Sequence, residues 1–328
     1  MRSADPPLRN RRPTWAEIDL DNLVHNFRVM KEAVGSGVAI MPALKADAYG
    51  HGAVECGLAL EEAGADWFGV ALPEEGVLLR QAGISRPILC LGGFWQGQEE
   101  IMASNDLTPA IFRIDALEWL DRQADSAGRV LNYHLKVDTG MGRLGVPVAH
   151  LAEFLDGAAR FLNVKLDGLM SHLASADIPE KIEYTHRQIE LFDKAIGLVR
   201  SRGHKPAWLH QGNSAAAHAI PPAHGNMVRL GGVLYGLWRD STTRAVEPLD
   251  WRPVMTLHTR VGFLKRLPAG SSLGYGNSFV TSRESVVATL PIGYEDGVFR
   301  ALSNRGRVLV GGRYAPIVGR VSMDLIMV

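Results

Sequence analysis

The feature that most constrains the fold is an alternation of short β-like runs with helical patterns, which extends from Val38 to Gly236. The stretches between the runs, such as "AVECGLALEEAG", repeat apolar residues at helical spacing and end in glycine. The expected strands are residues 38–44, 66–72, 87–91, 107–112, 131–138, 164–172, 207–212 and 226–236. Eight strands with helical connections over roughly 200 residues predict a closed (β/α)8 TIM barrel. A short strand and a helix capped by Asp19 or Asp21 are expected before it.

The pattern changes after Tyr235, where apolar and polar residues alternate and turn signals such as Gly311-Gly312 appear. We therefore expect the barrel to span residues 13–245 and a smaller all-β domain to span residues 246–328, which residues 1–12 could join. The last stretch, "SMDLIMV", has the pattern of a strand, and nothing follows in the sequence to pair with it or bury it. We expect this β domain to be truncated at its C-terminus.

Composition narrows the classes of partner and compartment. Lys plus Arg and Asp plus Glu number 35 each, so the net charge is zero and argues against a nucleic-acid or membrane partner. Cys56 and Cys90 lie in apolar stretches, which favours buried thiols in a reducing compartment over a disulfide or a metal site. No secretory signal and no run of about 20 apolar residues is found. We expect a cytoplasmic protein without a metal site.

Chemically reactive residues recur where the expected strands end, which is where TIM barrels place their functional groups. Taken singly, each has an ordinary explanation: a solvated lysine, an interior histidine, a helix cap or a glycine turn. Only their shared placement at one face of the barrel favours a functional site. The candidates are Lys45, Lys136, Arg143, His172, Asn213, Ser214, Arg229, Gly231 and Gly232.

The chemistry of these residues indicates a small phosphorylated cofactor. The hydroxyl of Ser214 and backbone N–H groups at Gly231 and Gly232 would form an anion cradle, to which Tyr49 could add a phenolic donor. Neither a Walker loop nor a Rossmann fingerprint is present, which argues against ATP and NAD. A lone lysine, Lys45, facing a phosphate site suggests a Schiff base with pyridoxal phosphate.

Eight blocks carry a family resemblance: "ALKADAYGHG", "LKVDTGMGRLG", "GLMSHLASAD", "GNSAA", "VRLGGVLYG", "LGYGNSF", "IGYEDG" and "GRVSMDL". In this order and spacing they resemble the signature blocks of the alanine racemases, a family of fold-type III enzymes that use pyridoxal 5'-phosphate (PLP). The resemblance runs from about residue 13 to the last residue. It implies a PLP-binding barrel, a C-terminal β domain and a head-to-tail homodimer whose active sites lie at the interface. The implied activity interconverts L- and D-alanine, either to supply peptidoglycan precursors or to degrade D-alanine.

The resemblance also assigns the proton transfers. Lys45 would bind PLP and act as one base, and Tyr275 of the partner subunit would act as the other, moving the Cα proton of an external aldimine. Inversion requires such a pair, because a proton leaves one face of Cα and another returns to the opposite face. His172 would hydrogen-bond Tyr275 and relay its proton. Arg229 would face the pyridine nitrogen and, being protonated, leave that nitrogen unprotonated, which favours rapid reprotonation over transamination.

The remaining assignments from the resemblance concern the substrate side. Arg143 would contact the cofactor's phenolic oxygen and the substrate carboxylate, and Lys136 occupies a position that is often carbamylated in relatives. Met323, Asp324 and Tyr294 would line the substrate pocket. Relatives continue past "SMDL" and supply a tyrosine to the PLP phosphate, so we expect weaker cofactor binding here, by about 1.5–3 kcal/mol for one lost charged hydrogen bond.

Alternatives remain open at this point. A racemase of serine, of lysine or of broad specificity would share these blocks. A truncated PLP-binding pseudoenzyme without turnover would share them too. A fold-type III decarboxylase fits less well, since those enzymes carry an acidic residue where Arg229 stands. His51, within "KADAYGHG", has no role that the residues themselves indicate.

Overall fold

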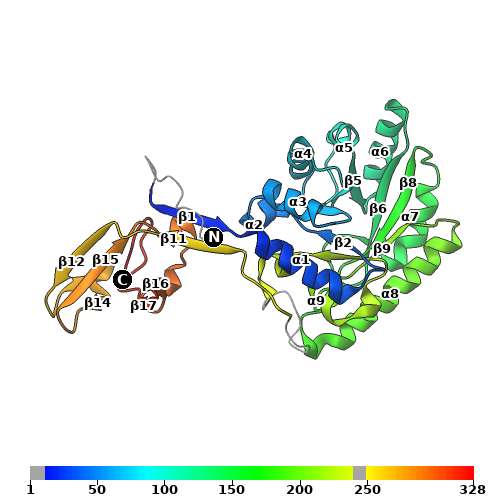
Figure 1. Cartoon of the computed structure of the whole chain (residues 1–328). Helices are drawn as coiled ribbons and strands as arrows, with labels where there is room; N and C mark the ends of the chain where they lie inside the picture. Colours follow the sequence, from blue (N-terminus) through cyan, green and yellow to red (C-terminus); the bar gives the residue numbers. More distant parts are fainter. Residues whose placement is uncertain (1–11, 239–248) are drawn as a thin grey trace. The chain divides into compact units, whose positions relative to one another are not determined.

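The computed structural model describes residues 12–238 and 249–328, which form two compact units (Figure 1). The barrel unit runs from Ile18 to Val254, and the β unit combines the residues up to Glu17 with Met255–Val328. The expected boundary between residues 245 and 246 lies outside the described residues, as do residues 1–11 of the expected N-terminal segment.

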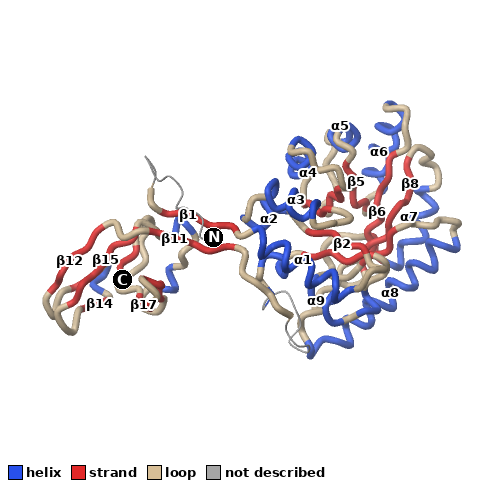
Figure 2. Tube along the Cα trace, viewed as in Figure 1, coloured by secondary structure: helices blue, strands red, loops and turns tan. Residues whose placement is uncertain are grey.

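Eight parallel strands form the wall of the barrel unit (Figure 2). They are β2 (Ala39–Pro42), β3 (Phe68–Val70), β4 (Ile88–Cys90), β5 (Leu107–Ile111), β6 (Leu131–Asp138), β8 (Val164–Met170), β9 (Trp208–His210) and β10 (Met227–Leu230). Pairing runs in chain order from β3 to β9, and β10 pairs with β2. A bridge between Ala43 and Gly69 joins β2 to β3, and the Arg229 N–H donates to the Gly212 carbonyl (3.0 Å) between β9 and β10. The expected (β/α)8 barrel is therefore confirmed.

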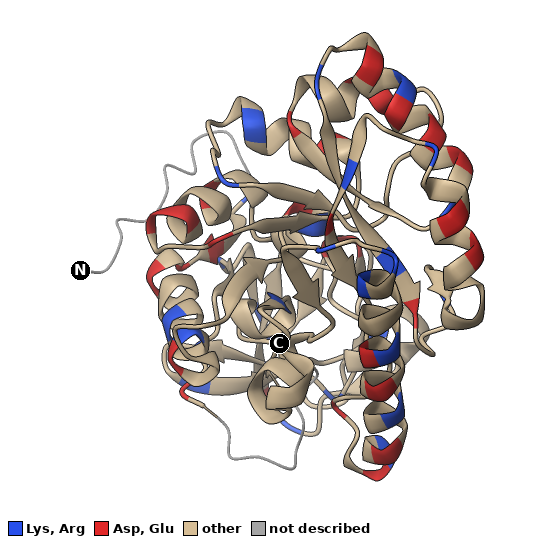
Figure 3. Cartoon of the chain, turned by 90° about the vertical axis from the view of Figure 1, so that its right-hand side faces the viewer, with Lys and Arg blue, Asp and Glu red and all other residues tan. Residues whose placement is uncertain are grey.

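Helices surround the strands and carry many of the charged residues (Figure 3). They are α1 (Leu20–Val34), α3 (Ala53–Glu62), α4 (Pro73–Gln81), α5 (Glu99–Ser104), α6 (Ile114–Ser126), α7 (Leu151–Ala158), α8 (Ile182–Ser201) and α9 (Ser214–Ala219). Asp19 caps α1, because its carboxylate accepts the Asn22 N–H at 2.9 Å. Of the two caps predicted, the structure selects Asp19. A two-residue strand, β7 (Val146–Pro147), pairs with the end of β6.

Alternate residues of the barrel strands enter different apolar clusters. Ile40 of β2 packs in the cluster that contains Leu23 and Phe27 of α1, between strands and helices. Its neighbour Met41 points to the other face of β2 and packs inside the barrel, against Leu89 and other side chains. Successive strand residues point to opposite faces, so this pattern gives the barrel an apolar interior as well as an apolar outer wall.

The β unit consists of short antiparallel sheets. Its elements are β1 (Thr14–Ile18), β11 (Met255–Thr259), β12 (Phe263–Leu267), β13 (Ser272–Leu273), β14 (Phe279–Val280), β15 (Ser285–Leu290), β16 (Arg307–Val310), β17 (Arg313–Pro316) and β18 (Ile326–Met327). The sheets are β1–β11, β12–β15–β18, β13–β14 and β16–β17. The β unit has two small cores: Leu290, Ile292, Ile317, Val321 and Ile326 form one, and Leu273, Val287 and Val318 form the other.

The final stretch corrects one expectation. We predicted that "SMDLIMV" would find no pairing partner and stay exposed, but its strand, β18, pairs with β15 through Thr289–Met327 and Leu290–Ile326. Ile326 is 3% exposed and belongs to the core of the β unit. The prediction failed because the pairing partner precedes this strand by some forty residues, which the local pattern does not reveal.

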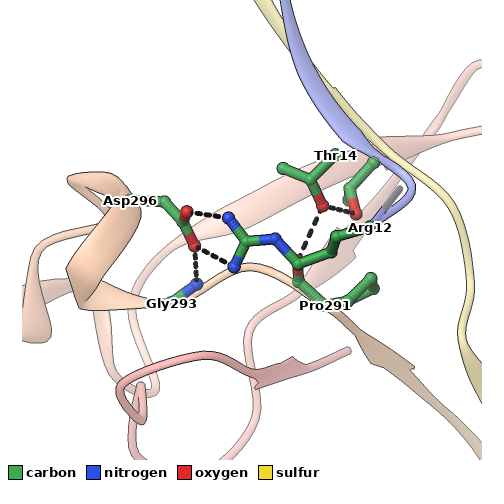
Figure 4. Close-up of polar contacts among 6 residues, drawn as sticks. Arg12, Thr14, Pro291, Gly293 and Asp296 are labelled. Carbon is green, nitrogen blue, oxygen red and sulfur yellow. Dashed lines mark hydrogen bonds and ion pairs between the residues drawn. The ribbon is translucent and has the colours of Figure 1, made fainter. Parts of the chain in front are cut away.

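Polar contacts fasten the N-terminal strand to the loops of the β unit (Figure 4). Arg12 forms a bidentate ion pair with Asp296, whose carboxylate also accepts the Gly293 N–H at 2.9 Å. Thr14 donates its hydroxyl to the Pro291 carbonyl at 2.6 Å. The loop over residues 293–296 carries Tyr294, so these contacts fix the backbone next to a predicted substrate-side residue.

Cys56 and Cys90 are buried free thiols, as predicted. Burial raises the pKa of the Cys56 thiol to about 12, so it stays protonated at neutral pH. None of the helices in the described parts of the chain has the length and apolar character needed to cross a membrane.

Candidate active site

A cavity of about 420 Å³ lies at the ends of the barrel strands. It gathers every barrel-unit residue that the sequence singled out for the site: Lys45, Tyr49, Lys136, Arg143, His172, Asn213, Ser214, Arg229, Gly231 and Gly232. The lining residues that the sequence did not suggest are Ala43, Ala71, Leu91, Gly92, Leu144, Met170, Asp177 and Ala215. Most of these residues lie at or near the end of a barrel strand and have no reactive side chain. Their position next to a strand end was therefore the only sequence signal that could have predicted them.

Lys45 opens a segment with an unusual backbone. The residues of α2 (Lys45–Gly50) that follow the lysine, from Ala46 to Tyr49, have φ of 51° to 57° and ψ of 35° to 51°, so this turn is left-handed. Each non-glycine residue in this region costs about 1–2 kcal/mol relative to the right-handed form. Strain of this kind persists where the surroundings enforce it and is typical of functional sites.

Tyr49 reaches from this turn to β10. A Cβ atom added at Gly231 would lie 2.5 Å from the Tyr49 hydroxyl oxygen, so only glycine leaves room for the hydroxyl there. Burial raises the pKa of Tyr49, which keeps the phenol protonated as a hydrogen-bond donor. The predicted phenolic donor thus lies beside the predicted glycine pair.

Ser214 and Asn213 are engaged differently from what we expected. The Gly231 N–H donates to the Ser214 hydroxyl oxygen at 3.0 Å, so that N–H is already bonded and is not one of the free cradle donors we predicted. This contact leaves the Ser214 hydrogen to be donated elsewhere. Asn213 caps α9 by accepting the Ala216 N–H at 3.1 Å.

Arg229 lies buried between strand ends. Its guanidinium donates to the carbonyls of Ser171 (2.6 Å) and His210 (3.0 Å) and to the ring nitrogen Nδ1 of His210 (2.6 Å). Desolvation lowers the pKa of Arg229 to about 10, so it stays protonated at neutral pH. Because Arg229 donates to Nδ1, the neutral His210 ring carries its proton on Nε2 and donates to Nδ1 of His134 at 2.9 Å.

The sequence did not suggest His134 or His210. Both are polar residues inside apolar strands, "LNYHLKVD" and "AWLHQG", and that mismatch was the available signal. Both rings are fully buried. Desolvation, reinforced by Arg229, lowers the pKa of His134 to about 3 and places the pKa of His210 well below its usual range. The positive charge beneath the cavity therefore resides on Arg229 alone among these three groups.

His172 is neutral for the same reasons. Desolvation first, and then the charges of Arg229, Arg143, Lys136 and Lys45, lower the pKa of His172 to about 3. Arg229 lies 3.2 Å from its Nδ1. Arginine has no acceptor, so Nδ1 accepts, and the remaining hydrogen of the ring sits on Nε2.

Lys136 is a buried amine in a cationic environment. Desolvation, followed by the charges of Arg229, Arg143 and Lys45, lowers the pKa of Lys136 to about 8. Its Nζ donates to the Leu91 carbonyl at 3.4 Å. About a tenth of this amine is therefore unprotonated at pH 7, far more than for an ordinary lysine.

The loop that carries Arg143 is held by one carboxylate. Asp138, at the end of β6, accepts the N–H groups of Gly140 (2.8 Å) and Gly142 (3.0 Å). Gly145 has φ of +134°, and an added Cβ would come within 2.5 Å of the Asp138 nitrogen. The loop can therefore fold back onto β6 only with glycine at this position.

The four remaining predicted site residues belong to the β unit. Tyr275 is 73% exposed and lines a separate hollow of about 410 Å³ with Arg320 and Ser322. Tyr294 donates its N–H to the Ser322 carbonyl at 2.9 Å, and the next N–H, that of Glu295, donates to the Met323 carbonyl at 3.1 Å. Within the β unit, the turn with Tyr294 is thus joined to the stretch that contains Met323 and Asp324.

The groups around the cavity fit a planar phosphorylated aldehyde. Lys45 offers an amine, Tyr49 and Ser214 offer hydroxyl donors, and the basic side chains of Lys136, Arg143 and Arg229 favour an anion. The space at Gly231, which a Cβ would fill, leaves Tyr49 beside the backbone that the phosphate would contact. Within residues 12–238 and 249–328, no group of three or more His, Cys, Asp or Glu side chains is arranged to hold a metal ion.

Comparisons with known proteins agree with this site. The family model "Alanine racemase, N-terminal domain" matches residues 18–238, and "Alanine racemase, C-terminal domain" matches residues 254–328. An alanine racemase of Halothermothrix orenii is 46% identical over 318 residues, which cover 97% of this chain and 83% of that protein.

Two solved structures share the fold. The alanine racemase of Bacillus anthracis, with bound L-Ala-P, has a TM-score of 0.86 at 34% identity and covers 96% of this chain and 81% of its own. The alanine racemase of Bartonella henselae, with covalently bound pyridoxal phosphate, has a TM-score of 0.85 at 28% identity and covers 96% of this chain and 85% of its own.

The barrel with its reactive lysine and anion-binding wall defines the class of fold-type III enzymes that depend on PLP. Within this class, the chain belongs to the alanine racemase family and is an isomerase. The predicted family, fold and cofactor are confirmed. The comparisons support an alanine racemase over a serine or lysine racemase and over a pseudoenzyme.

Proposed function

We propose that this chain interconverts L- and D-alanine by moving the Cα proton between two bases, Lys45 and Tyr275 of the partner subunit. The observation that carries the proposal is that Lys45, His172 and Arg229 line one cavity whose remaining groups suit a phosphate and a carboxylate. Each residue has a distinct task, which follows from its protonation state and its hydrogen bonds.

Lys45 would hold the cofactor, and Tyr49 and Ser214, which line the same cavity, would donate their hydroxyls to its phosphate. Bound PLP supplies an electron-withdrawing ring that acidifies the substrate Cα–H. With PLP and substrate bound, the Lys45 amine would remove or return a proton on one face of the substrate Cα. The left-handed turn places the Lys45 Nζ 5.8 Å from the centre of the Tyr49 ring.

Tyr275 serves the opposite face of Cα and must lose its phenolic proton to act as a base. His172 supports this state: its Nδ1 accepts from Arg229, so its Nε2–H is the group that can donate to a phenolate oxygen. A neutral imidazole that donates one hydrogen bond stabilises the phenolate without a charge of its own. We therefore assign His172 to holding the phenolate of Tyr275.

Arg229 controls what happens after the proton leaves. As a protonated donor, Arg229 would hydrogen-bond the pyridine nitrogen of bound PLP without protonating it, whereas a carboxylic acid at this position would protonate it. Arg229 would thereby weaken the electron withdrawal by the ring and favour return of the proton to Cα over other reactions. The buried chain Arg229–His210–His134 holds the guanidinium in place.

Arg143 would bind the substrate carboxylate and the phenolic oxygen of bound PLP, and Lys136, which lines the same cavity, would support it. The unprotonated amine of Lys136 can add CO₂ to form a carbamate with release of one proton, and this carbamate would be an anionic partner for Arg143. Met323, Asp324 and Tyr294 complete the substrate pocket from the partner subunit. A head-to-tail homodimer with shared sites follows, and buried reduced thiols favour work in the cytoplasm.

The test is direct. Purified protein loaded with PLP and incubated with L-alanine should form D-alanine, measured by chiral chromatography. Lys45→Ala should abolish this activity, whereas Lys194→Ala, at an exposed position of α8, should retain it. If a PLP-loaded preparation forms no D-alanine, the proposal fails.

A further inference from the structure

The left-handed turn after Lys45 is held at both ends by side chains that do not line the cavity. The turn contains four successive residues with positive φ, Ala46 to Tyr49, none of which is glycine. Such a backbone relaxes to another form unless outside contacts hold it. The contacts that hold it therefore decide where the lysine amine and the tyrosine hydroxyl point.

Glu75 of α4 holds the beginning of the turn. Its Oε1 accepts the N–H of Ala46, the residue directly after Lys45, at 2.6 Å. Its Oε2 accepts the N–H groups of Ala71 (2.6 Å) and Leu72 (3.1 Å), which follow β3. One carboxylate thus ties the catalytic turn to the end of the neighbouring barrel strand, and such charge-assisted bonds are short and strong.

His51 holds the end of the turn. Its Nδ1 lies 3.0 Å from the carbonyl oxygens of both Ala48 and Tyr49. Both partners are acceptors, so Nδ1 must carry a hydrogen and donate it. The ring is 7% exposed, and its centre lies 4.7 Å from that of Tyr235.

Tyr235 connects this end of the turn to the barrel wall. Its hydroxyl donates to the Ala43 carbonyl at 2.8 Å, two residues before Lys45, and its ring also packs against Tyr49, with centres 5.0 Å apart. The turn is therefore held at Ala46 by Glu75, at its last carbonyls by His51, and along its side by Tyr235.

We propose that Glu75 and His51 are positioning residues that enforce the left-handed turn. The turn in this form places the Lys45 amine and the Tyr49 hydroxyl where both can contact the same cofactor molecule. This inference rests on the proposed function for the identity of the reaction. It gives a role to His51, which stands in the "KADAYGHG" block. It also gives a role to Glu75, which lies some thirty residues after Lys45 and bonds the backbone of this block.

The test compares matched substitutions in the full-length holoenzyme. His51→Leu removes the Nδ1 donor, whereas His51→Asn places an amide N–H₂ where Nδ1 was. Glu75→Gln removes the charge and one acceptor, and Glu74→Gln, its exposed neighbour on α4, is the control. For each variant we would measure the PLP dissociation constant by fluorescence titration, the visible absorbance of the lysine-bound cofactor, and kcat and KM separately.

We expect His51→Leu and Glu75→Gln to weaken PLP binding about tenfold and to lower kcat about 10- to 100-fold with little change in KM. His51→Asn should recover most of the PLP affinity, and Glu74→Gln should behave as wild type. Wild-type PLP affinity, absorbance and kcat in both His51→Leu and Glu75→Gln would overturn the inference. The inference would also be overturned if His51→Asn bound PLP no more tightly, and turned over no faster, than His51→Leu.

Two outcomes separate this inference from the proposed function. If wild type binds PLP through Lys45 but does not racemise alanine, while the variants still lose PLP, the proposed function fails and the positioning roles stand. If wild type racemises alanine and the variants match it, only the positioning roles fail. Glu75→Gln is nearly isosteric with the native residue, and His51→Asn keeps a donor in place of Nδ1, so these two variants test the inference even if His51→Leu does not fold.

Discussion

The guanidinium of Arg229 donates to Nδ1 of His172 across 3.2 Å, and this contact fixes the tautomer of the histidine. Arg229 touches both His172 and His210, and the carbonyls of Ser171 and Gln211 hold it in place. One buried cation thus sets the hydrogen-bonding direction of two imidazoles.

Nitrogen NMR of histidine-labelled protein tests this tautomer. We expect His172 to show a protonated Nε2 and an unprotonated Nδ1, with no change from pH 8 down to about pH 5, because burial and nearby cations lower its pKa to about 3. Assignment would come from loss of the signal in His172→Gln. A His172 signal that titrates near pH 6 would contradict this prediction.

Acid should destabilise the fold through the buried histidines. Desolvation places the folded-state pKa of His134 and of His172 near 3, far below the unfolded value of about 6.5. The unfolded state therefore binds more protons below pH 6.5. The contribution of each ring to stability is complete above pH 6.5 and decreases by about 1.4 kcal/mol per pH unit as the pH falls towards 3.

Urea unfolding between pH 7 and pH 4.5 would measure this effect. His134→Asn, which keeps an acceptor for His210, should make the free energy of unfolding less dependent on pH. His150→Asn, at an exposed position, should leave the dependence unchanged. Equal pH dependence in wild type and His134→Asn would refute the assignment.

Gly231→Ala should weaken PLP binding about tenfold, because the new Cβ would lie 2.5 Å from the Tyr49 hydroxyl and displace it. Tyr49→Phe removes the hydroxyl that the new Cβ would displace. In the Tyr49→Phe background, Gly231→Ala should therefore reduce PLP affinity by a smaller factor than it does in wild type. Gly197→Ala, in α8 with open space around it, is the control. Additive losses in a double-mutant cycle would show that the two positions do not interact.

Lys136 should react with CO₂ increasingly as the pH rises through its lowered pKa of about 8, since only the unprotonated amine reacts. Carbon-13 NMR in the presence of labelled bicarbonate should show a carbamate signal. The signal should be absent from Lys136→Gln and present in Lys194→Gln. A spectrum without a carbamate at pH 8.5 would count against the modification.

Subunit mixing tests the shared active site. Lys45→Ala and Tyr275→Phe should each be nearly inactive, but mixed dimers would hold one intact site per heterodimer. After exchange of equal amounts, activity should return to about a quarter of wild type. If the mixture stays as inactive as its components, Lys45 and Tyr275 do not meet across subunits.

Local sequence determined much of this protein. Hydrophobic runs and helical spacing located all eight barrel strands, because these periodicities reflect burial on one face of each element. The last strand was predicted too long: β10 ends at Leu230, and a 3-10 helix covers Gly232–Tyr235, where we expected the strand to continue to residue 236. Reactive residues at strand ends were expected to share one face of the barrel, and they line one cavity. The signature blocks around Lys45 and Arg229 indicated the family from the sequence alone.

Tertiary structure decided the rest. The left-handed turn after Lys45 depends on Glu75 and Tyr235, which are distant in sequence, and the buried chain from His134 to Arg229 depends on three strands meeting in register. Two further contacts also depend on the tertiary structure. The Gly231 N–H meets Ser214 only when the barrel closes, and β18 pairs with β15 only when the β unit packs. The periodicity of a sequence predicts which residues are buried. It does not predict which residues contact the strained turn or the neutral histidines, because those contacts join segments that lie far apart in the chain.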